Sequence, residues 1–374
     1  MTKKSLIAAG LLFFLIFSQP AVAAQKPDSL SVKIGQMLMI GFRGTALENA
    51  PEIAADIAER RIGGVVLFDY DVPAHSPSRN IISPQQLASL TLELQKLSDI
   101  PLLIAIDQEG GKVNRLKQIR GFPASVSAEY LGRLNHPDST TSAAAQTART
   151  LKAMHISMNL APVSDLNTNP DNPVIGKLAR SFSSNPSVVI SNLQLIIKAY
   201  HNEGIIATLK HFPGHGSSTT DTHRDFTDIT VSWSEQELEP YRALIDSGFH
   251  DAVMTAHVFN GKLDPLYPAT LSKQTLTGLL REKLRFKGVI VSDDMQMKAI
   301  TDRYGLETAL QLAIEAGVDL LLFGNNTCYD PAIASKATEI IRSLLQKGII
   351  SPERIDQSYQ RIMDLKKRYR SGAR

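Results

Sequence analysis

The sequence predicts an α/β fold, a (β/α)8 TIM barrel formed by a single domain. Eight short apolar segments rich in Val, Ile, Leu or Met recur along the chain, and segments with helical periodicity lie between them. The apolar segments are continuous rather than alternating, which is typical of parallel strands covered on both faces. The expected strands are residues 36–42, 62–68, 102–106, 157–163, 205–209, 252–256, 288–291 and 320–323.

Helices are expected between these strands. They cover residues 84–97, 143–154, 186–202, 235–247, 273–284 and 306–316, and two closing helices cover 331–346 and 352–369. Ser83-Pro84 and Ser234 are typical helix starts, and Gly317 is a typical helix stop. A doubly wound open sheet shares this alternation and is the alternative fold. Because no linker or repeat interrupts residues 28–374, they are predicted to form one domain.

The first residues have the pattern of a signal peptide. Lys3 and Lys4 give a positive start, and residues 6–17 form an apolar core that is short for a membrane span. Small residues at 21–24 offer a cleavage site, so residues 1–24 are expected to be removed from an exported, periplasmic or secreted protein. No cysteine follows the apolar core, so no lipid anchor is expected, and an uncleaved anchor is the alternative.

The composition is typical of a soluble globular protein. Of the 374 residues, 43% are hydrophobic and 21% are charged, and the net charge of +3 does not indicate a nucleic-acid surface. Cys328 is the only cysteine, so the chain cannot form an internal disulfide and its stability has to come from core burial. We expect Cys328 to be a packing or loop residue.

Polar residues directly follow the expected strands. In a barrel, the carboxyl ends of all strands converge on one face, where active sites are built. Random surface polarity would fall at both ends of the strands, so this clustering predicts an active site. The residues concerned are Asp107, Asp165, Lys210, His211, His257, Asp293, Asp294, Asn325 and Asn326.

Asp293 is the strongest single catalytic candidate. It follows the seventh apolar segment, where a rigid strand would hold its carboxylate. A carboxylate in that position can attack a sugar carbon or bind a metal ion, and a helix N-cap is the alternative role. The neighbouring Asp294 should point elsewhere, so we expect a structural or capping role for it.

The glycine-rich loop after the fifth strand carries a second pair. Asp221 could orient His223 and favour its protonated form, and a histidine near neutral pH can donate and later accept a proton. An Asx-turn beside an exposed histidine is the alternative. His211 and His215 add ligand types suitable for zinc, but the spacing matches no compact zinc motif, so no metal is expected.

Cationic side chains near the same face could hold a sugar. Lys210, Arg115 and Arg180, together with Asp107, could bind hydroxyl and carbonyl groups through charge-assisted hydrogen bonds. Ordinary surface ion pairs are the alternative for the arginines. The glycines after Asp107 are expected where the backbone approaches a ligand closely, although the segment lacks phosphate-loop spacing.

Several motifs together resemble glycoside hydrolase family 3, in its single-domain β-N-acetylglucosaminidase branch. They are Asp107-Gln108-Glu109-Gly110-Gly111 with Arg115, Asn159-Leu160-Ala161-Pro162-Val163, Lys210-His211-Phe212-Pro213-Gly214-His215-Gly216, Asp221-Thr222-His223 and Ser292-Asp293. The resemblance covers nearly the whole chain after the signal segment.

The resemblance implies a role for each matching position. Asp293 would attack the anomeric carbon and form a covalent glycosyl-enzyme, while His223 would be the general acid/base, tuned by Asp221. N-acetylglucosamine would be held by Asp107, Arg115, Arg180, Lys210 and His211. Two features depart from the family: Thr222 replaces the usual serine, and residues 174–182 are two residues longer before their arginine, which puts the placement of Arg180 in doubt.

These observations predict a retaining exo-β-N-acetylglucosaminidase that needs no cofactor. Its expected partners are glycans derived from peptidoglycan or chitin, with no nucleic acid and no stable membrane anchor after signal cleavage, and the protein is expected to be a monomer. A phosphorylase on the same scaffold is one alternative, because a neutral base would tolerate attack by phosphate. A non-catalytic glycan-binding protein is the other alternative.

Overall fold

Eight parallel strands form a barrel at the centre of the molecule. The computed structural model describes residues 29–222 and 226–371. Its strands are β1 (Leu38–Gly41), β2 (Gly64–Leu67), β3 (Leu103–Ile106), β4 (Met158–Asn159), β5 (Ile206–Phe212), β7 (Ala252–Thr255), β9 (Val289–Val291) and β10 (Leu321–Phe323). They pair in the order β10-β1-β2-β3-β4-β5-β7-β9, and a parallel bridge from Val291 to Leu320 joins the two outer strands. The predicted TIM barrel is confirmed, and the doubly wound alternative is wrong.

Seven of the eight apolar segments singled out in the sequence contain a whole strand, and the fifth, residues 205–209, contains the first part of β5. The segments were continuous in their apolar character because the strands are buried on both faces, as β2 and β3 show along their whole length. The end of β5 differs from the prediction. β5 was expected to end at Leu209 but continues through Lys210 and His211, because its backbone still pairs with β7 at Phe212 and Thr255. Two polar side chains therefore stand on the strand itself.

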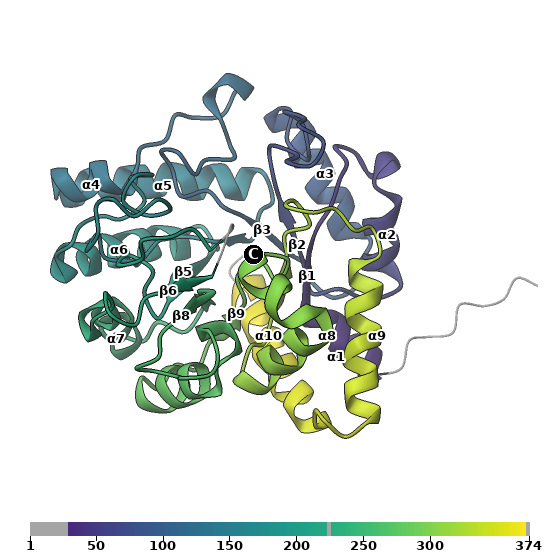
Figure 1. Ribbon diagram of the computed structural model, residues 1–374. Helices are drawn as coiled ribbons and strands as arrows, with labels where there is room; N and C mark the ends of the chain where they lie inside the picture. Colours follow the sequence, from purple (N-terminus) through teal and green to yellow (C-terminus); the bar gives the residue numbers. More distant parts are fainter. Residues whose placement is uncertain (1–28, 223–225, 372–374) are drawn as a thin grey trace, which may run out of the picture.

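Helices surround the barrel (Figure 1). The α-helices are α1 (Ser29–Gln36), α2 (Pro51–Ala58), α3 (Pro84–Lys96), α4 (Ala128–Leu134), α5 (Pro137–Ala153), α6 (Pro186–Asn202), α7 (Glu239–Asp246), α8 (Lys298–Ala316), α9 (Ile333–Gln346) and α10 (Pro352–Ser371). Shorter helical elements are η1 (Leu47–Asn49), η2 (Gln118–Arg120), η3 (Glu235–Leu238), η4 (Ala269–Leu271) and the π-helix η5 (Gln274–Lys283).

The predicted helix ends have identifiable causes. The Ser83 side chain accepts a hydrogen bond from the backbone N–H of Gln86 at 3.2 Å, which caps α3 as expected. Gly317 has a φ of 120° and ends α8. The helix expected at residues 235–247 is divided into η3 and α7. Three helices, α1, α2 and α4, were not expected from the sequence, and Gln36 belongs to α1 rather than to the first strand.

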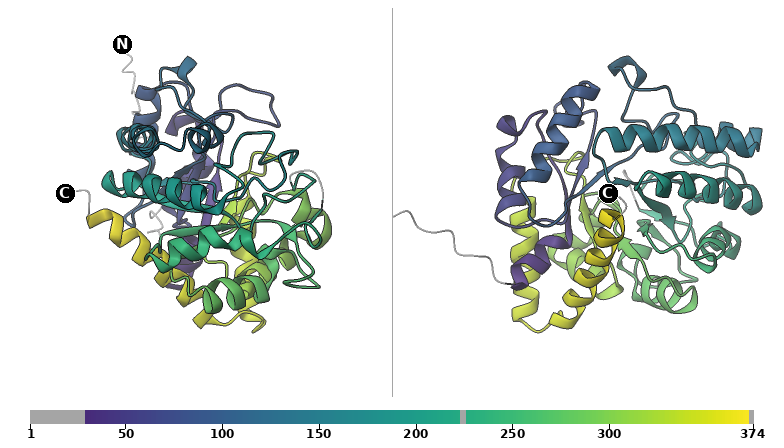
Figure 2. Two further views of the ribbon diagram at one scale, coloured as in Figure 1. Left: turned by 90° about the vertical axis from the view of Figure 1, so that its left-hand side faces the viewer. Right: turned by 180° about the vertical axis from the view of Figure 1, so that it is seen from behind.

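The two ends of the barrel differ. At the carboxyl end of the strands, the loops after β5 and β7 pair through β6 (Thr227–Asp228) and β8 (Val258–Phe259), which form a small second sheet. At the opposite end lies α10 (Figure 2). Its Lys366 donates a hydrogen bond to the carbonyl oxygen of Gly63, just before β2. Within the described ranges, no helix is both long and apolar enough to cross a membrane. The expected signal peptide, residues 1–24, lies outside them.

Candidate active site

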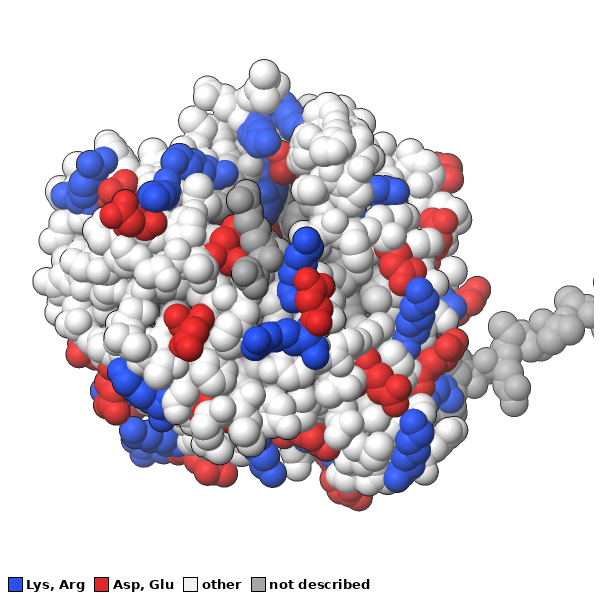
Figure 3. All heavy atoms as spheres, in the orientation of Figure 1, with Lys and Arg blue, Asp and Glu red and all other residues white. Residues whose placement is uncertain are grey.

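A cavity of about 570 Å³ opens at the carboxyl end of the barrel strands. Figure 3 shows charged side chains of both signs around the hollow on this face. Seven of the eight residues proposed from the sequence line the cavity, namely Asp107, Arg115, Arg180, Lys210, His211, Asp221 and Asp293. The eighth, His223, lies outside the described residues. The barrel therefore brings together side chains that are up to 186 positions apart in the sequence (293 − 107).

Lys210 is the cation at the centre of the site. It stands near the end of β5, its side chain is 2% exposed, and its Nζ lies 2.8 Å from Asp107 Oδ1 and 2.7 Å from Glu109 Oε1. Burial by itself lowers the pKa of Lys210, but the two carboxylates outweigh it and raise the pKa above the ordinary value. The lysine therefore stays charged, and it can hold Asp107 in place for a ligand.

Glu109 is the site residue that sequence reasoning missed. Its carboxylate accepts two hydrogen bonds from Arg180, at 2.8 and 2.7 Å, besides the contact with Lys210. Burial raises the pKa of Glu109, but the two cations outweigh burial and lower the pKa to about 2. The signal was present in the sequence, because Glu109 lies two residues after Asp107 in the same glycine-containing motif. Its negative charge fixes both cations.

Arg180 reaches the cavity from the segment that follows β4. Residues 172–180 fold back on themselves, with the N–H of Arg180 donating to the Ile175 carbonyl oxygen at 3.1 Å. The guanidinium also lies 3.3 Å from His211 Nε2. Burial lowers the pKa of Arg180, and the Glu109 carboxylate more than compensates, so the pKa is raised. This turn directly precedes Arg180, whose side chain lines the cavity as expected.

Arg115 is held more loosely. Its guanidinium lies 3.5 Å from Asp107 Oδ2 and 3.9 Å from Asp69 Oδ1, and its side chain is 27% exposed. The Asp107 carboxylate therefore has a cation on each side, Lys210 and Arg115. Burial raises the pKa of Asp107, but these two cations lower it overall. The carboxylate is ionised and can accept hydrogen bonds from two hydroxyl groups.

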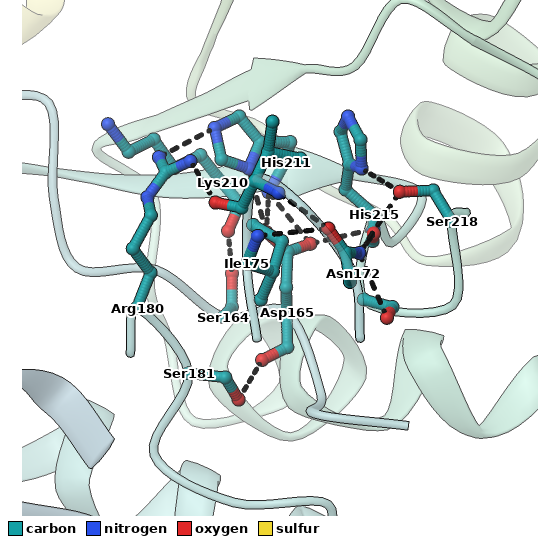
Figure 4. A network of polar contacts seen from close by, with 12 residues as sticks. Ser164, Asp165, Asn172, Ile175, Arg180, Ser181, Lys210, His211, His215 and Ser218 are labelled. Carbon is teal, nitrogen blue, oxygen red and sulfur yellow. Dashed lines mark hydrogen bonds and ion pairs between the residues drawn. The ribbon is translucent and has the colours of Figure 1, made fainter. Parts of the chain in front are cut away.

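Asp165 orients the histidine that follows Lys210. Its buried carboxylate lies 2.7 Å from His211 Nδ1 and accepts hydrogen bonds from the backbone N–H groups of His211 and His215 (Figure 4). Burial raises the pKa of Asp165, but His211 lowers it overall. Because Nδ1 is engaged, Nε2 of His211 is directed to the cavity side, next to Arg180. Asp165 thus supports the site and does not line the cavity.

The two adjacent aspartates after β9 have different environments. Both line the cavity, and Asp293 Oδ1 accepts the N–H of Asp294 at 2.8 Å. Asp294 Oδ1 accepts the N–H groups of Gln296 and Gly324, at 3.0 and 2.9 Å, and so ties the loop after β9 to the end of β10. These hydrogen bonds support the structural role predicted for Asp294, but the expectation that it points away from the site is wrong, because it also lines the cavity. The N-cap of α8 is Met297, so the N-cap alternative for Asp293 is wrong.

The loop that leads to Asp221 is held by buried polar groups. His215 does not line the cavity; its Nδ1 lies 2.8 Å from Ser218 Oγ and its Nε2 lies 3.3 Å from Thr222 Oγ1. Burial, aided by the nearby His211, lowers the pKa of His215 to about 4, so its ring is neutral at neutral pH. Among the described residues, no group of three His, Cys, Asp or Glu side chains could hold a metal ion.

The glycines after Asp107 have a structural requirement of their own. Gly110 and Gly111 have positive φ angles of 98° and 60°. A Cβ on Gly110 would lie 2.2 Å from the Val126 carbonyl oxygen, and one on Gly111 would lie 2.6 Å from the Ser127 side chain. These glycines are required because another segment of the same chain packs against them, whether or not a ligand also approaches this backbone.

Known proteins with the same fold carry names that describe one chemistry. The chain is 34% identical to β-hexosaminidase A of Pseudoalteromonas piscicida over 342 residues, covering 82% of this chain and 55% of that protein. It is 34% identical to a β-hexosaminidase of Nitrosomonas eutropha over 320 residues, covering 82% and 84%. A glycoside hydrolase family 3 β-N-acetylglucosaminidase structure from Paenibacillus sp. superimposes with a TM-score of 0.84 at 35% identity, covering 93% of this chain and 64% of that one.

The barrel, its charged cavity and these relatives define the class of protein as a glycoside hydrolase. Residues 29–365 match the model of the glycosyl hydrolase family 3 N terminal domain, and the chain belongs to this family. It spans about half the length of the Pseudoalteromonas relative and about two thirds of the Paenibacillus structure, so it corresponds to only part of each.

Proposed function

We propose that the protein is a retaining exo-β-N-acetylglucosaminidase that removes terminal β-linked N-acetylglucosamine from glycans derived from peptidoglycan or chitin. One observation carries the proposal: a single cavity contains Asp293, Asp221 and the ion-paired set around Asp107 and Lys210. The names of the relatives support the same chemistry.

Asp293 is the nucleophile in this proposal. Its carboxylate oxygen attacks the anomeric carbon, the glycosidic C–O bond breaks, and a covalent glycosyl-aspartate forms. Water then displaces the aspartate from the opposite face, so the sugar leaves with its original configuration. The place of Asp293 directly after the buried strand β9 supports this role, because a strand end holds the carboxylate in one position.

His223 is the proposed general acid/base. It protonates the leaving oxygen in the first step and takes a proton from water in the second step. Asp221, which lines the cavity, is proposed to orient and charge the imidazole. A deprotonated histidine is neutral, so it would not repel the Asp293 carboxylate as a second carboxylate would.

The sugar-holding residues are proposed to be Asp107, Arg115, Arg180, Lys210 and His211. The ionised Asp107 can accept from two sugar hydroxyls, and His211 Nε2 and the guanidinium groups can donate to hydroxyl or carbonyl oxygens. Apolar side chains from the barrel interior, Val66, Met254 and Leu322, form the inner wall. A cavity closed on that side favours a chain end over the middle of a chain.

We also propose that residues 28–374 are one catalytic domain and that residues 1–24 direct export. The proposal of export rests on the charged start and apolar core of the first segment. An exported enzyme would meet intact wall or chitin fragments. The deciding measurement is product identification from muropeptides and chitobiose, with and without phosphate. Release of free N-acetylglucosamine at the same rate with and without phosphate supports hydrolysis. A sugar phosphate as the main product would replace the proposal with phosphorolysis.

A further inference from the structure

The short segment 213–218, which connects β5 to the loop that carries Asp221, is held from two sides. On one side, Asp165 Oδ1 accepts the N–H of His215 at 2.8 Å, and Asn172 Nδ2 donates to the carbonyl oxygens of His215 and Gly216 at 2.7 and 3.1 Å (Figure 4). These groups follow β4 in the chain. The segment therefore cannot shift away from the barrel without breaking buried hydrogen bonds.

The other side is formed by η3 and by Trp233, two residues before it. Glu237 Oε2 accepts the N–H of Gly216 at 3.1 Å, and Trp233 Nε1 donates to the Pro213 carbonyl oxygen at 3.1 Å. Glu237 also packs directly on Gly214, whose φ is 124°. A Cβ on Gly214 would lie 2.6 Å from both Glu237 Cβ and Glu237 Oε2. The glycine and the glutamate are complementary in shape, and each restricts the other.

A direct contact links this segment to the proposed acid/base loop. Asp165 and Asn172 hold the backbone of His215. The ring Nε2 of His215 lies 3.3 Å from Thr222 Oγ1. Thr222 is the neighbour of Asp221, which lines the cavity. A second contact, from Thr220 Oγ1 to Thr227 Oγ1 at 2.9 Å, ties the loop to β6. Movement of residues 214–216 would therefore be passed to Asp221.

Glu237 itself is 1% exposed and does not line the cavity, so it cannot touch a substrate there. Burial raises the pKa of Glu237 to about 7, and the facing Asp165 carboxylate adds to the rise. A glutamine at this position would keep the size of the side chain and one acceptor oxygen. An aspartate would keep the charge but would be one methylene too short to reach the Gly216 N–H.

We propose that Glu237 is a positioning residue for the acid/base step. Through its contacts with Gly214 and Gly216, and through His215, it fixes the position of the loop that carries Asp221. The inference rests on the proposed function, because it assigns Glu237 to the same reaction. It predicts a specific kinetic signature, since a displaced acid/base loop impairs protonation of the leaving group and leaves the nucleophile on β9 in place.

The test compares two substrates on variants of the full chain. With an N-acetylglucosaminide of a poor leaving group, Glu237→Asp and Glu237→Ala should lower kcat by about 10- to 100-fold, a part of the 10²–10⁴-fold that acid catalysis supplies. With an activated aryl glycoside the loss should stay below about 3-fold in the glycosylation step, because little protonation is needed. Glu237→Gln should keep the rates on both substrates within about 3-fold of the wild-type rates. Glu235→Ala, an exposed site on the same short helix, is the matched control and should behave as the wild type.

Equal losses on both substrates for Glu237→Asp, or no loss on either, would overturn the inference. If Glu237→Ala does not fold, Glu237→Asp and Glu237→Gln still decide, because both conserve most of the buried volume. The proposed function is tested separately by the wild type. A wild type that hydrolyses no β-N-acetylglucosaminide would overturn both proposals. If the wild type is active but the Glu237 variants lose equal activity on both substrates, only the role of Glu237 is overturned.

Discussion

The ammonium group of Lys210 lies 2.7 Å from the Glu109 carboxylate, which also accepts two hydrogen bonds from Arg180. Lys210 stands near the end of β5, and Glu109 follows β3. One buried carboxylate thus fixes two of the cations that we propose to hold the sugar. The binding groups are ordered before any ligand arrives, which reduces the entropy that binding has to overcome.

Removing the Glu109 charge should therefore weaken both substrate binding and the fold. Losing one partner of a buried ion pair costs about 3–5 kcal/mol, because the other charge stays buried without compensation. For Glu109→Gln we expect KM to rise by about 10-fold or more and the melting temperature to fall, as measured by steady-state kinetics and calorimetry. Glu52→Gln, at an exposed position of α2, is the control. An unchanged KM would contradict the assigned role.

Asp293 should form a covalent adduct with a slow fluorinated substrate. Because the proposed mechanism passes through a glycosyl-aspartate, intact mass spectrometry of the wild type should show the added mass of one sugar. Asp293→Ala should show none, whereas Asp302→Asn, an exposed site on α8, should still be labelled. Labelling of Asp293→Ala to the wild-type extent would assign the nucleophile to another residue.

His223→Ala should separate substrates by leaving group. Poor leaving groups need a proton from the enzyme, so their turnover should fall by about 10²–10⁴-fold, while activated aryl glycosides should lose far less in glycosylation. The measurement is a series of aryl glycosides whose phenols differ in pKa, with His136→Ala as the control. A uniform loss across the series would argue against the acid role of His223.

Stability should depend on pH through Lys366. This lysine is 3% exposed and its Nζ donates to Gln36 Oε1 at 2.6 Å and to the Gly63 carbonyl oxygen at 2.8 Å. Burial lowers its pKa to about 7, from 10.5. Between these two values the unfolded chain binds more protons than the folded protein, so this group makes the free energy of unfolding rise with pH.

The slope from this one group is at most about 1.4 kcal/mol per pH unit. Lys366→Met should remove that slope between pH 7 and about 10, and it should also cause a loss that does not depend on pH, because two hydrogen bonds disappear. Urea unfolding of both proteins across this range makes the comparison. Parallel curves for the wild type and the variant would show that Lys366 is not held with a lowered pKa.

Much of the barrel could be predicted because each barrel strand carries its own signal. The apolar segments around the eight barrel strands are continuous and are bounded by turn residues, whereas β6 and β8 have no such segment and were not expected. The signal weakened where polar residues continue a strand. Lys210 and His211 belong to β5 because backbone pairing with β7, and not side-chain polarity, decides where the strand ends. The short helices α2 and α4 were not anticipated, because neither offers a long apolar periodicity.

The sequence by itself determined the eight strand–helix units and therefore the face on which the polar residues meet. It also supplied the motifs from which each proposed role was assigned, His223 included. Only the tertiary structure decided which charges pair: that Glu109 serves both Lys210 and Arg180, that Asp165 orients His211, and that the glycines at 110 and 111 accommodate the chain itself. Periodicity is local and can be read along the chain, whereas an ion pair depends on distances between strand ends, which exist only after the barrel closes.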